Sequence, residues 1–166
     1  MILVILCIIG CILFGSFIMI SVIKNQVAWI NEYPESVQQR YIDLHPEAVI
    51  KEPEGMSVRV ITKKLIACAI FLTLLVGMVY IAGARTFGQG ALFCYIIWFV
   101  VNVFDTLVLD LGFMVHWKKC RLPGTEDMDE EYKQLNKKSL LDGVAGCIIG
   151  IPIALLAGAF IFLICR

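Results

Sequence analysis

The polar residues that could do chemistry inside a membrane lie in one apolar stretch of the chain. Asn102, Asp105, Thr106 and Asp110 interrupt a run of Val, Leu, Ile and Phe within residues 91–115. At about 100° per residue of an α-helix, all four fall within one arc of about 140°. One face of this helix therefore avoids lipid, and we expect the four residues to form a polar or ion-binding site.

Asp105 lies in the inner half of this run. A carboxylate inside hydrocarbon costs about 3 kcal/mol or more unless it is protonated, hydrated, paired or bound to a metal ion. No Lys or Arg lies within any of the chain's long apolar runs. The functional hypotheses are a proton- or cation-coupling site and a general acid or base. The structural alternative is a protonated Asp105 that forms hydrogen bonds inside a helix bundle.

Asp110 lies nearer the inner boundary, where it can also reach cytoplasmic water or Lys118. Because an α-helix turns by about 140° between residues five apart, Asp105 and Asp110 do not form a ready-made carboxylate pair. A metal site would need further ligands from another helix or another copy. The seven cysteines contain no CxxC spacing. The sequence therefore predicts neither a metal site nor a cofactor.

A third acid, Asp142, lies at the beginning of another apolar run. Ser139-Leu-Leu-Asp142 matches a capping box, in which the acid accepts hydrogen bonds from the first backbone N–H groups of a helix. We therefore interpret Asp142 as a residue of the helix N-terminus.

Four apolar runs, each of about 20 to 25 residues, are long enough to cross about 30 Å of hydrocarbon as helices. They cover residues 2–23, 65–84, 91–115 and 140–164. The composition is 60% hydrophobic and 17% charged, with zero formal net charge, which excludes an ordinary soluble domain and a basic nucleic-acid binder. The sequence predicts an all-α integral membrane four-helix bundle, a single membrane domain over residues 1–166 in contact with the lipid bilayer.

The basic residues of the connecting segments predict the orientation of this bundle. Residues 24–64 and 116–139 carry six Lys or Arg each, whereas only Arg85 lies between the second and third runs and only Arg166 follows the fourth. Since basic loops stay in the cytoplasm, we expect both long segments there and both termini on the extracytoplasmic side. The expected location is the cytoplasmic (plasma) membrane.

Both long segments carry helix signals. Pro34 and Pro46 bracket a predicted helix that places Val37, Tyr41 and Leu44 on one side. This helix either lies on the inner membrane surface or packs on the ends of the bundle. In the second segment, Thr125 is predicted to be the N-cap of a helix.

Small residues recur every fourth position in the last apolar run, at Gly146, Gly150, Ala154 and Gly158. Such a ridge allows another helix to approach closely, and its partner lies either in the same chain or in a second copy.

Three functions fit this sequence. The favoured one is a packing or assembly subunit of a membrane complex, present as a homo-oligomer or with a membrane-protein partner. The alternative is a small proton- or cation-coupled transporter or channel that uses the polar face of residues 91–115. A membrane-embedded enzyme at the cytoplasmic boundary is the least favoured. A polar cavity that reaches Asp105 from water would indicate transport, whereas a dry, hydrogen-bonded Asp105 would indicate assembly.

Overall fold

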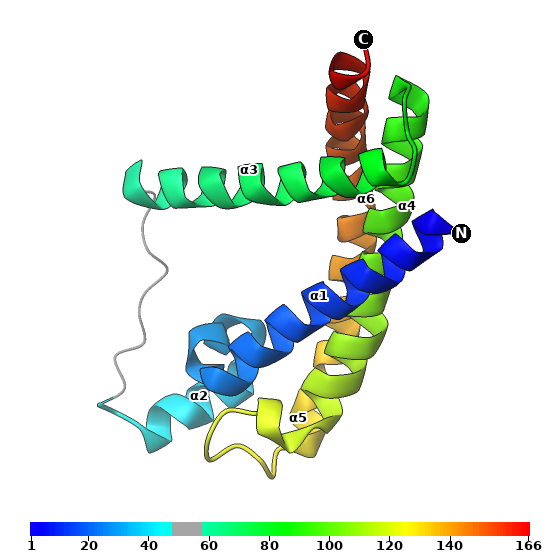
Figure 1. Ribbon diagram of the computed structural model, residues 1–166. Helices are drawn as coiled ribbons and strands as arrows, with labels where there is room; N and C mark the ends of the chain where they lie inside the picture. Colours follow the sequence, from blue (N-terminus) through cyan, green and yellow to red (C-terminus); the bar gives the residue numbers. More distant parts are fainter. Residues whose placement is uncertain (48–57) are drawn as a thin grey trace. The chain divides into compact units, whose positions relative to one another are not determined.

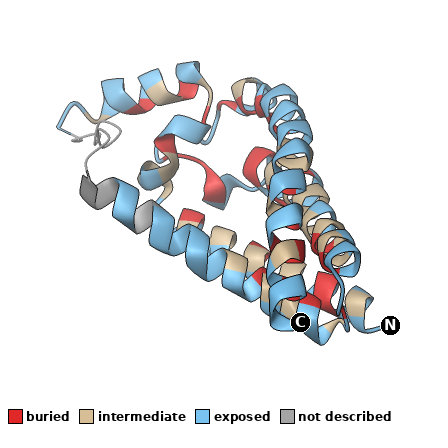
Figure 2. Ribbon diagram, turned by 90° about the horizontal axis from the view of Figure 1, so that it is seen from above, coloured by how far each residue is buried: buried red, intermediate tan, exposed pale blue. Residues whose placement is uncertain are grey.

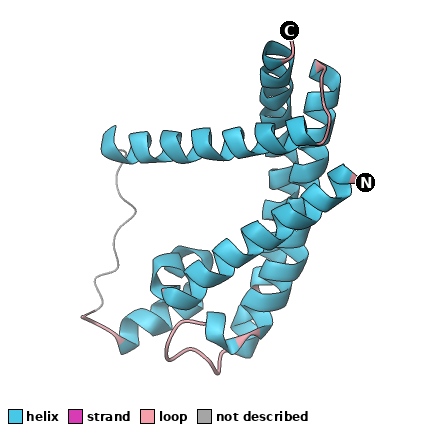
Figure 3. Cartoon of the chain, in the orientation of Figure 1, coloured by secondary structure: helices cyan, strands magenta, loops and turns pink. Residues whose placement is uncertain are grey.

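The computed structural model describes residues 1–47 and 58–166, without the side chains of residues 58–60, 63 and 64. Residues 48–57 of the predicted cytoplasmic segment, with the basic Lys51, lie outside the described residues. The described chain forms helices joined by short loops and contains no strand, so the all-α fold class is confirmed (Figure 3).

The described chain contains six α-helices, two 3₁₀-helices and one π-helix (Figure 1). The α-helices are α1 (Ile2–Lys24), α2 (Glu35–Leu44), α3 (Val58–Ile81), α4 (Phe87–Phe104), α5 (Asp129–Tyr132) and α6 (Leu135–Ile164). The 3₁₀-helices are η1 (Gln26–Glu32) and η3 (Lys118–Cys120). The segment η2 (Asp105–Met114), which continues α4 directly, is a π-helix.

Three helical stretches of the described chain are long and apolar enough to cross a membrane: Ile2–Lys24, Phe87–Met114 and Asp129–Ile164. They contain the predicted spans at 2–23, 91–115 and 140–164, except for one residue at the end of the second. The predicted span at 65–84 coincides with a shorter apolar stretch, Leu65–Ile81 of α3. The chain is therefore a helical membrane protein.

Exposed residues lie along the long helices (Figure 2), and many of them are large and apolar. In α1, Ile5, Ile12 and Phe17 are 48%, 60% and 68% exposed. Apolar side chains lose nothing when they face lipid tails, which are themselves apolar. The exposed surface of α1 is therefore typical of a helix in contact with a bilayer.

The described chain divides into two compact units. The first contains residues 1–10, 58–100 and 147–166. Within it, glycines bring α4 and α6 into backbone contact: a Cβ atom on Gly90 would lie 2.9 Å from the Cα atom of Gly158, and one on Gly158 would lie 2.7 Å from the carbonyl oxygen of Phe87. Any larger side chain at these positions would force the helices apart.

The second unit contains residues 11–47 and 101–146. Much of its core comes from the segments between the long helices. The cluster consists of Val22, Ile30, Tyr33, Val37, Tyr41, Met114, Val115, Cys120, Leu122, Met128, Tyr132 and Leu135. The helix predicted after Pro34 is confirmed as α2, and its Val37 and Tyr41 are buried in this core. Of the two interpretations of that helix, the structure supports packing on other elements.

The N-cap predicted at Thr125 is wrong. Thr125 is fully buried, its hydroxyl donates to the carbonyl oxygen of Leu122 at 2.8 Å, and it lies 2.8 Å from the hydroxyl of Tyr132. The helix α5 begins only at Asp129. The Thr125 hydroxyl contacts Tyr132 and therefore does not cap a helix N-terminus.

Candidate functional site

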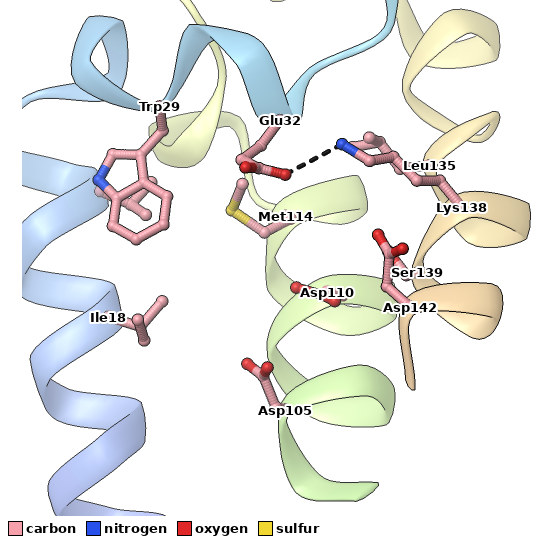
Figure 4. A pocket seen from close by; sticks show the side chains of 11 residues that line it. Ile18, Trp29, Glu32, Asp105, Asp110, Met114, Leu135, Lys138, Ser139 and Asp142 are labelled. Carbon is pink, nitrogen blue, oxygen red and sulfur yellow. Dashed lines mark hydrogen bonds and ion pairs between the residues drawn. The ribbon is translucent and has the colours of Figure 1, made fainter. Parts of the chain in front are cut away.

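A cavity of about 200 Å³ lies within the second unit, among α1, η1, η2 and the first two turns of α6 (Figure 4). The polar residues that line it are Glu32, Asp105, Asp110, Lys138, Ser139 and Asp142. The apolar residues that line it are Ile18, Val22, Trp29, Met114 and Leu135. Four carboxyl groups and one ammonium group thus share one cavity near the end of a membrane helix.

The π-helix explains how Asp105 and Asp110 come together. Because the hydrogen bonds of a π-helix join residues i and i+5, residues five apart lie nearly one above the other. Both side chains line the cavity. The divergence of about 140° expected from α-helical geometry is wrong here, because residues 105–114 are not α-helical.

The π-helix begins next to two side-chain hydrogen bonds. The Thr106 hydroxyl donates to the carbonyl oxygen of Asn102 at 3.0 Å, and the Asn102 amide donates to the carbonyl oxygen of Gly143 at 2.8 Å. A hydroxyl that donates to the residue four positions before it competes with the hydrogen bonds of the helix itself. Asn102 and Thr106 therefore contact α6, whereas Asp105 and Asp110 face the cavity.

Asp142 also belongs to the cavity. The predicted capping box at Ser139-Leu-Leu-Asp142 is wrong, because α6 begins at Leu135 and both residues lie inside the helix. Their side chains line the cavity together with that of Asp110 (Figure 4).

Glu32 and Lys138 form an ion pair across the cavity. The Nζ atom of Lys138 lies 2.9 Å from Oε2 of Glu32 (Figure 4), and the two side chains are 47% and 55% exposed. An ion pair as exposed as this one contributes little to stability. Its consequence is chemical, because it places one positive charge among four acids. Sequence reasoning missed both residues, since 106 positions separate them and neither belongs to a motif.

The small-residue ridge of α6 lies against polar and aromatic side chains. In the second unit, a Cβ atom on Gly146 would overlap the side chain of Asn102. In the first unit, one on Gly150 would overlap the indole of Trp98, while Ala154 is buried and Gly158 contacts the backbone of α4. These contacts lie within one chain and need no second copy.

The core of the second unit holds η1, and with it Trp29 and Glu32, beside the cavity. The Tyr33 hydroxyl donates to the carbonyl oxygen of Cys120, and the Tyr33 and Tyr132 rings pack edge to face with centroids 5.8 Å apart. Burial raises the pKa of the Tyr33 hydroxyl above its usual value, and neighbouring Tyr132 and Cys120 raise it further. Burial also raises the pKa of the Cys120 thiol. Cys120 is fully buried, so in this conformation the thiol is closed to modification.

A buried arginine, also missed from the sequence, completes this core. Arg121 is 5% exposed, and its guanidinium donates to the carbonyl oxygens of Glu126 and Val115 at 2.7 and 2.9 Å and to the carboxylate of Asp129. It also lies 4.6 Å from the centroid of the Tyr132 ring. Counting Arg121 only as a basic loop residue hid this role, because a charge count carries no information on burial.

The cavity is suited to hold a positively charged species. The ion pairs of the described chain leave Asp105, Asp110 and Asp142 without a Lys or Arg partner. Among the same residues, no group of three His, Cys, Asp or Glu side chains is placed to hold a metal ion. Comparison with protein-family models, curated proteins and solved structures gave no match for this chain.

Proposed function

We propose that this protein binds a proton or small cation at the acidic cavity and moves it across the membrane. The observation that carries the proposal is the cavity that Asp105, Asp110 and Asp142 line together. Carboxylates without a basic partner are costly inside a membrane span and usually mark an ion or proton pathway. A solvent-sized cavity beside Asp105 supports transport over the assembly role, which would leave Asp105 dry and hydrogen-bonded.

The proposal places four spans in the membrane. The fourth is α3, whose apolar stretch Leu65–Ile81 reaches about 25 Å at helical rise, a little less than the hydrocarbon thickness. Both termini lie outside, in the cytoplasmic membrane, because the basic residues gather in the two long connections. In this orientation the Glu32–Lys138 pair lies at the cytoplasmic end of the cavity. Four spans bury little interior, so we place the rest of the pathway between copies of a homo-oligomer.

Flux in liposomes tests the transport role. Purified protein is reconstituted into vesicles that contain a pH-sensitive dye, and proton or potassium gradients are imposed. We expect Asp105→Asn to lower the flux of the wild-type protein by about tenfold or more. The matched control is Asp127→Asn, an exposed acid paired with Arg40 and outside the cavity, which should leave the flux unchanged. Wild-type flux equal to that of protein-free vesicles would exclude transport of protons and potassium ions.

Cysteine labelling tests the orientation. In a variant without the seven native cysteines, Gly88→Cys and Lys119→Cys place single thiols at exposed positions on opposite sides of the proposed bundle. A membrane-impermeant maleimide should label Gly88→Cys in intact cells and Lys119→Cys only after lysis. The opposite pattern would reverse the orientation, and labelling of both in intact cells would change the number of spans.

A membrane-embedded enzyme is the second candidate. Lys138 beside Asp110 supports it, because an acid and an amine in one cavity can exchange a proton with a bound substrate. The pairing of Lys138 with Glu32 weakens this candidate, since that contact occupies the amine.

A further inference from the structure

Apolar and acidic side chains both line the cavity, and together they restrict the chemistry of its occupant. The lining includes Ile18, Trp29 and Met114 as well as four carboxyl groups. Figure 4 shows the indole of Trp29 and the carboxyl group of Asp142 on opposite sides of the cavity. Pockets with apolar walls and a few convergent polar groups bind ligands that carry both surfaces.

A bare metal ion fits this cavity poorly. Metal ions need several oxygen, nitrogen or sulfur ligands that converge within about 2.6 Å. Among the described residues, no three His, Cys, Asp or Glu side chains converge in that way. The cavity of about 200 Å³ is also far larger than the roughly 10–15 Å³ that a single water molecule needs. A dehydrated ion would leave most of it empty and would face hydrocarbon on one side.

Trp29 supplies an aromatic surface on which an organic cation can bind. The face of an indole attracts a positive charge, and it is the aromatic surface on which ammonium groups bind best. The backbone of η1 is held around Trp29, because Ile30 is buried in the core and the Asn25 side chain accepts a hydrogen bond from the backbone N–H of Ala28. The side chain of Trp29 is partly buried and packs against the core of the second unit.

The cavity already contains one alkylammonium group, which belongs to the chain. The side chain of Lys138 places its ammonium against Glu32 at 2.9 Å and its methylenes beside Leu135 (Figure 4). Lys138 thus shows which chemistry the cavity accepts, since it combines a positive charge with a short hydrocarbon chain. Asp105, Asp110 and Asp142 are further acidic groups in the same cavity.

We infer that the occupant of the cavity is a small organic ammonium ion, whose charge lies between the Asp105–Asp110 pair and the indole of Trp29 and whose hydrocarbon body contacts Ile18 and Met114. This inference rests on the proposed cation-binding function and specifies its ligand class.

Calorimetric titration of the full-length protein in detergent tests the inference, with tetramethylammonium chloride as the probe and potassium and magnesium chloride as comparisons. We expect saturable binding of tetramethylammonium that Trp29→Leu weakens by about 2- to 30-fold, the range that corresponds to one cation–π contact. Trp29→Phe keeps an aromatic face, so its affinity for tetramethylammonium should lie between those of wild type and Trp29→Leu. The matched control is Trp117→Leu, an exposed tryptophan outside the cavity, which should bind like wild type.

The outcomes separate the inference from the proposed function. If liposomes show proton or potassium flux but tetramethylammonium does not bind, the organic-cation inference is wrong and transport stands. If tetramethylammonium binds and liposomes show no flux of protons, potassium or tetramethylammonium, the ligand class stands and the transport role falls. Equal affinities of wild type, Trp29→Leu and Trp29→Phe would overturn the inference, because the indole would then not contact the ligand.

Discussion

Asp105 and Asp110 line one cavity although five residues separate them, because the helix that carries them is a π-helix at this point. An α-helix would turn the second carboxyl group away from the first by about 140°. π-Helical segments frequently occur at functional sites. Here the wider turn of the π-helix places Asp105 and Asp110 in the same cavity.

This relationship predicts energetic coupling between the two carboxyl groups. Asp105→Asn and Asp110→Asn each remove the repulsion between the two carboxylates. The double variant should therefore gain less stability than the sum of the gains of the two single variants. We expect a coupling of about 1 kcal/mol, measured as free energies of unfolding in detergent. An α-helical arrangement predicts effects that add.

The control for this double-mutant cycle combines Asp105→Asn with Asp127→Asn. Asp127 is exposed and forms an ion pair with Arg40. These two sites share no partner, so their effects should add within about 0.5 kcal/mol. A coupling for the control pair as large as for Asp105 and Asp110 would contradict the shared cavity.

The close contact of Gly150 with Trp98 predicts a penalty for the smallest possible side chain. A Cβ atom on Gly150 overlaps the indole, so Gly150→Ala should lower the free energy of unfolding by about 1–3 kcal/mol. Gly77→Ala is the matched control, because nothing lies within 4 Å of its Cβ position. Alanine is the better helix former by about 1 kcal/mol, so this control should be neutral or stabilising. Thermal unfolding in detergent measures both, and a neutral Gly150→Ala would refute the contact.

The hydrogen bonds of Arg121 predict that lysine cannot replace it. Lysine keeps the charge but loses the planar fork that reaches the carbonyl oxygens of Val115 and Glu126. We expect Arg121→Lys to destabilise the protein by about 2 kcal/mol or more. Asp129→Asn should have a smaller effect, since the Asp129 side chain is 61% exposed. Denaturant titration compares them, and equal losses would show that the ion pair, rather than the carbonyl contacts, matters.

The raised pKa of Tyr33 predicts alkaline instability. Because the folded-state pKa lies above the unfolded value of about 10, the stabilisation is complete below pH 10 and is lost as the pH rises through the folded value. Wild-type stability should therefore fall above pH 10, and Tyr33→Phe should show a shallower fall from a lower starting value. Unfolding measured over this pH range, together with tyrosinate absorbance, provides the test. Parallel pH profiles for the two proteins would exclude Tyr33 as the cause.

Local patterns predicted the features that local chemistry controls. Long apolar runs must be helical in a bilayer, because only intrahelical hydrogen bonds satisfy the backbone there, so α1, the α4–η2 helix and α6 follow from hydropathy. The helix α2 follows from Pro34 and Pro46, since proline starts a helix well and ends one. The importance of Asp105 follows from the cost of a charge in hydrocarbon, whatever the fold.

The cavity could not be predicted because non-local contacts build it. The π-helical turn accompanies contacts of Asn102 and Thr106 with α6, and a motif read along one segment does not contain them. For the same reason, Ser139 and Asp142 matched a capping box although α6 begins four residues before Ser139.

The sequence by itself determined that the chain is a helical membrane protein with an unpaired acid inside a span. Hydropathy and the cost of burying charge act on each segment independently, so these properties need no knowledge of neighbours. Only the tertiary structure decided that Asp105, Asp110 and Asp142 share a cavity with Trp29 and that Lys138 meets Glu32 beside them. Convergence of side chains depends on helix register and packing, and these emerge only when distant segments contact each other.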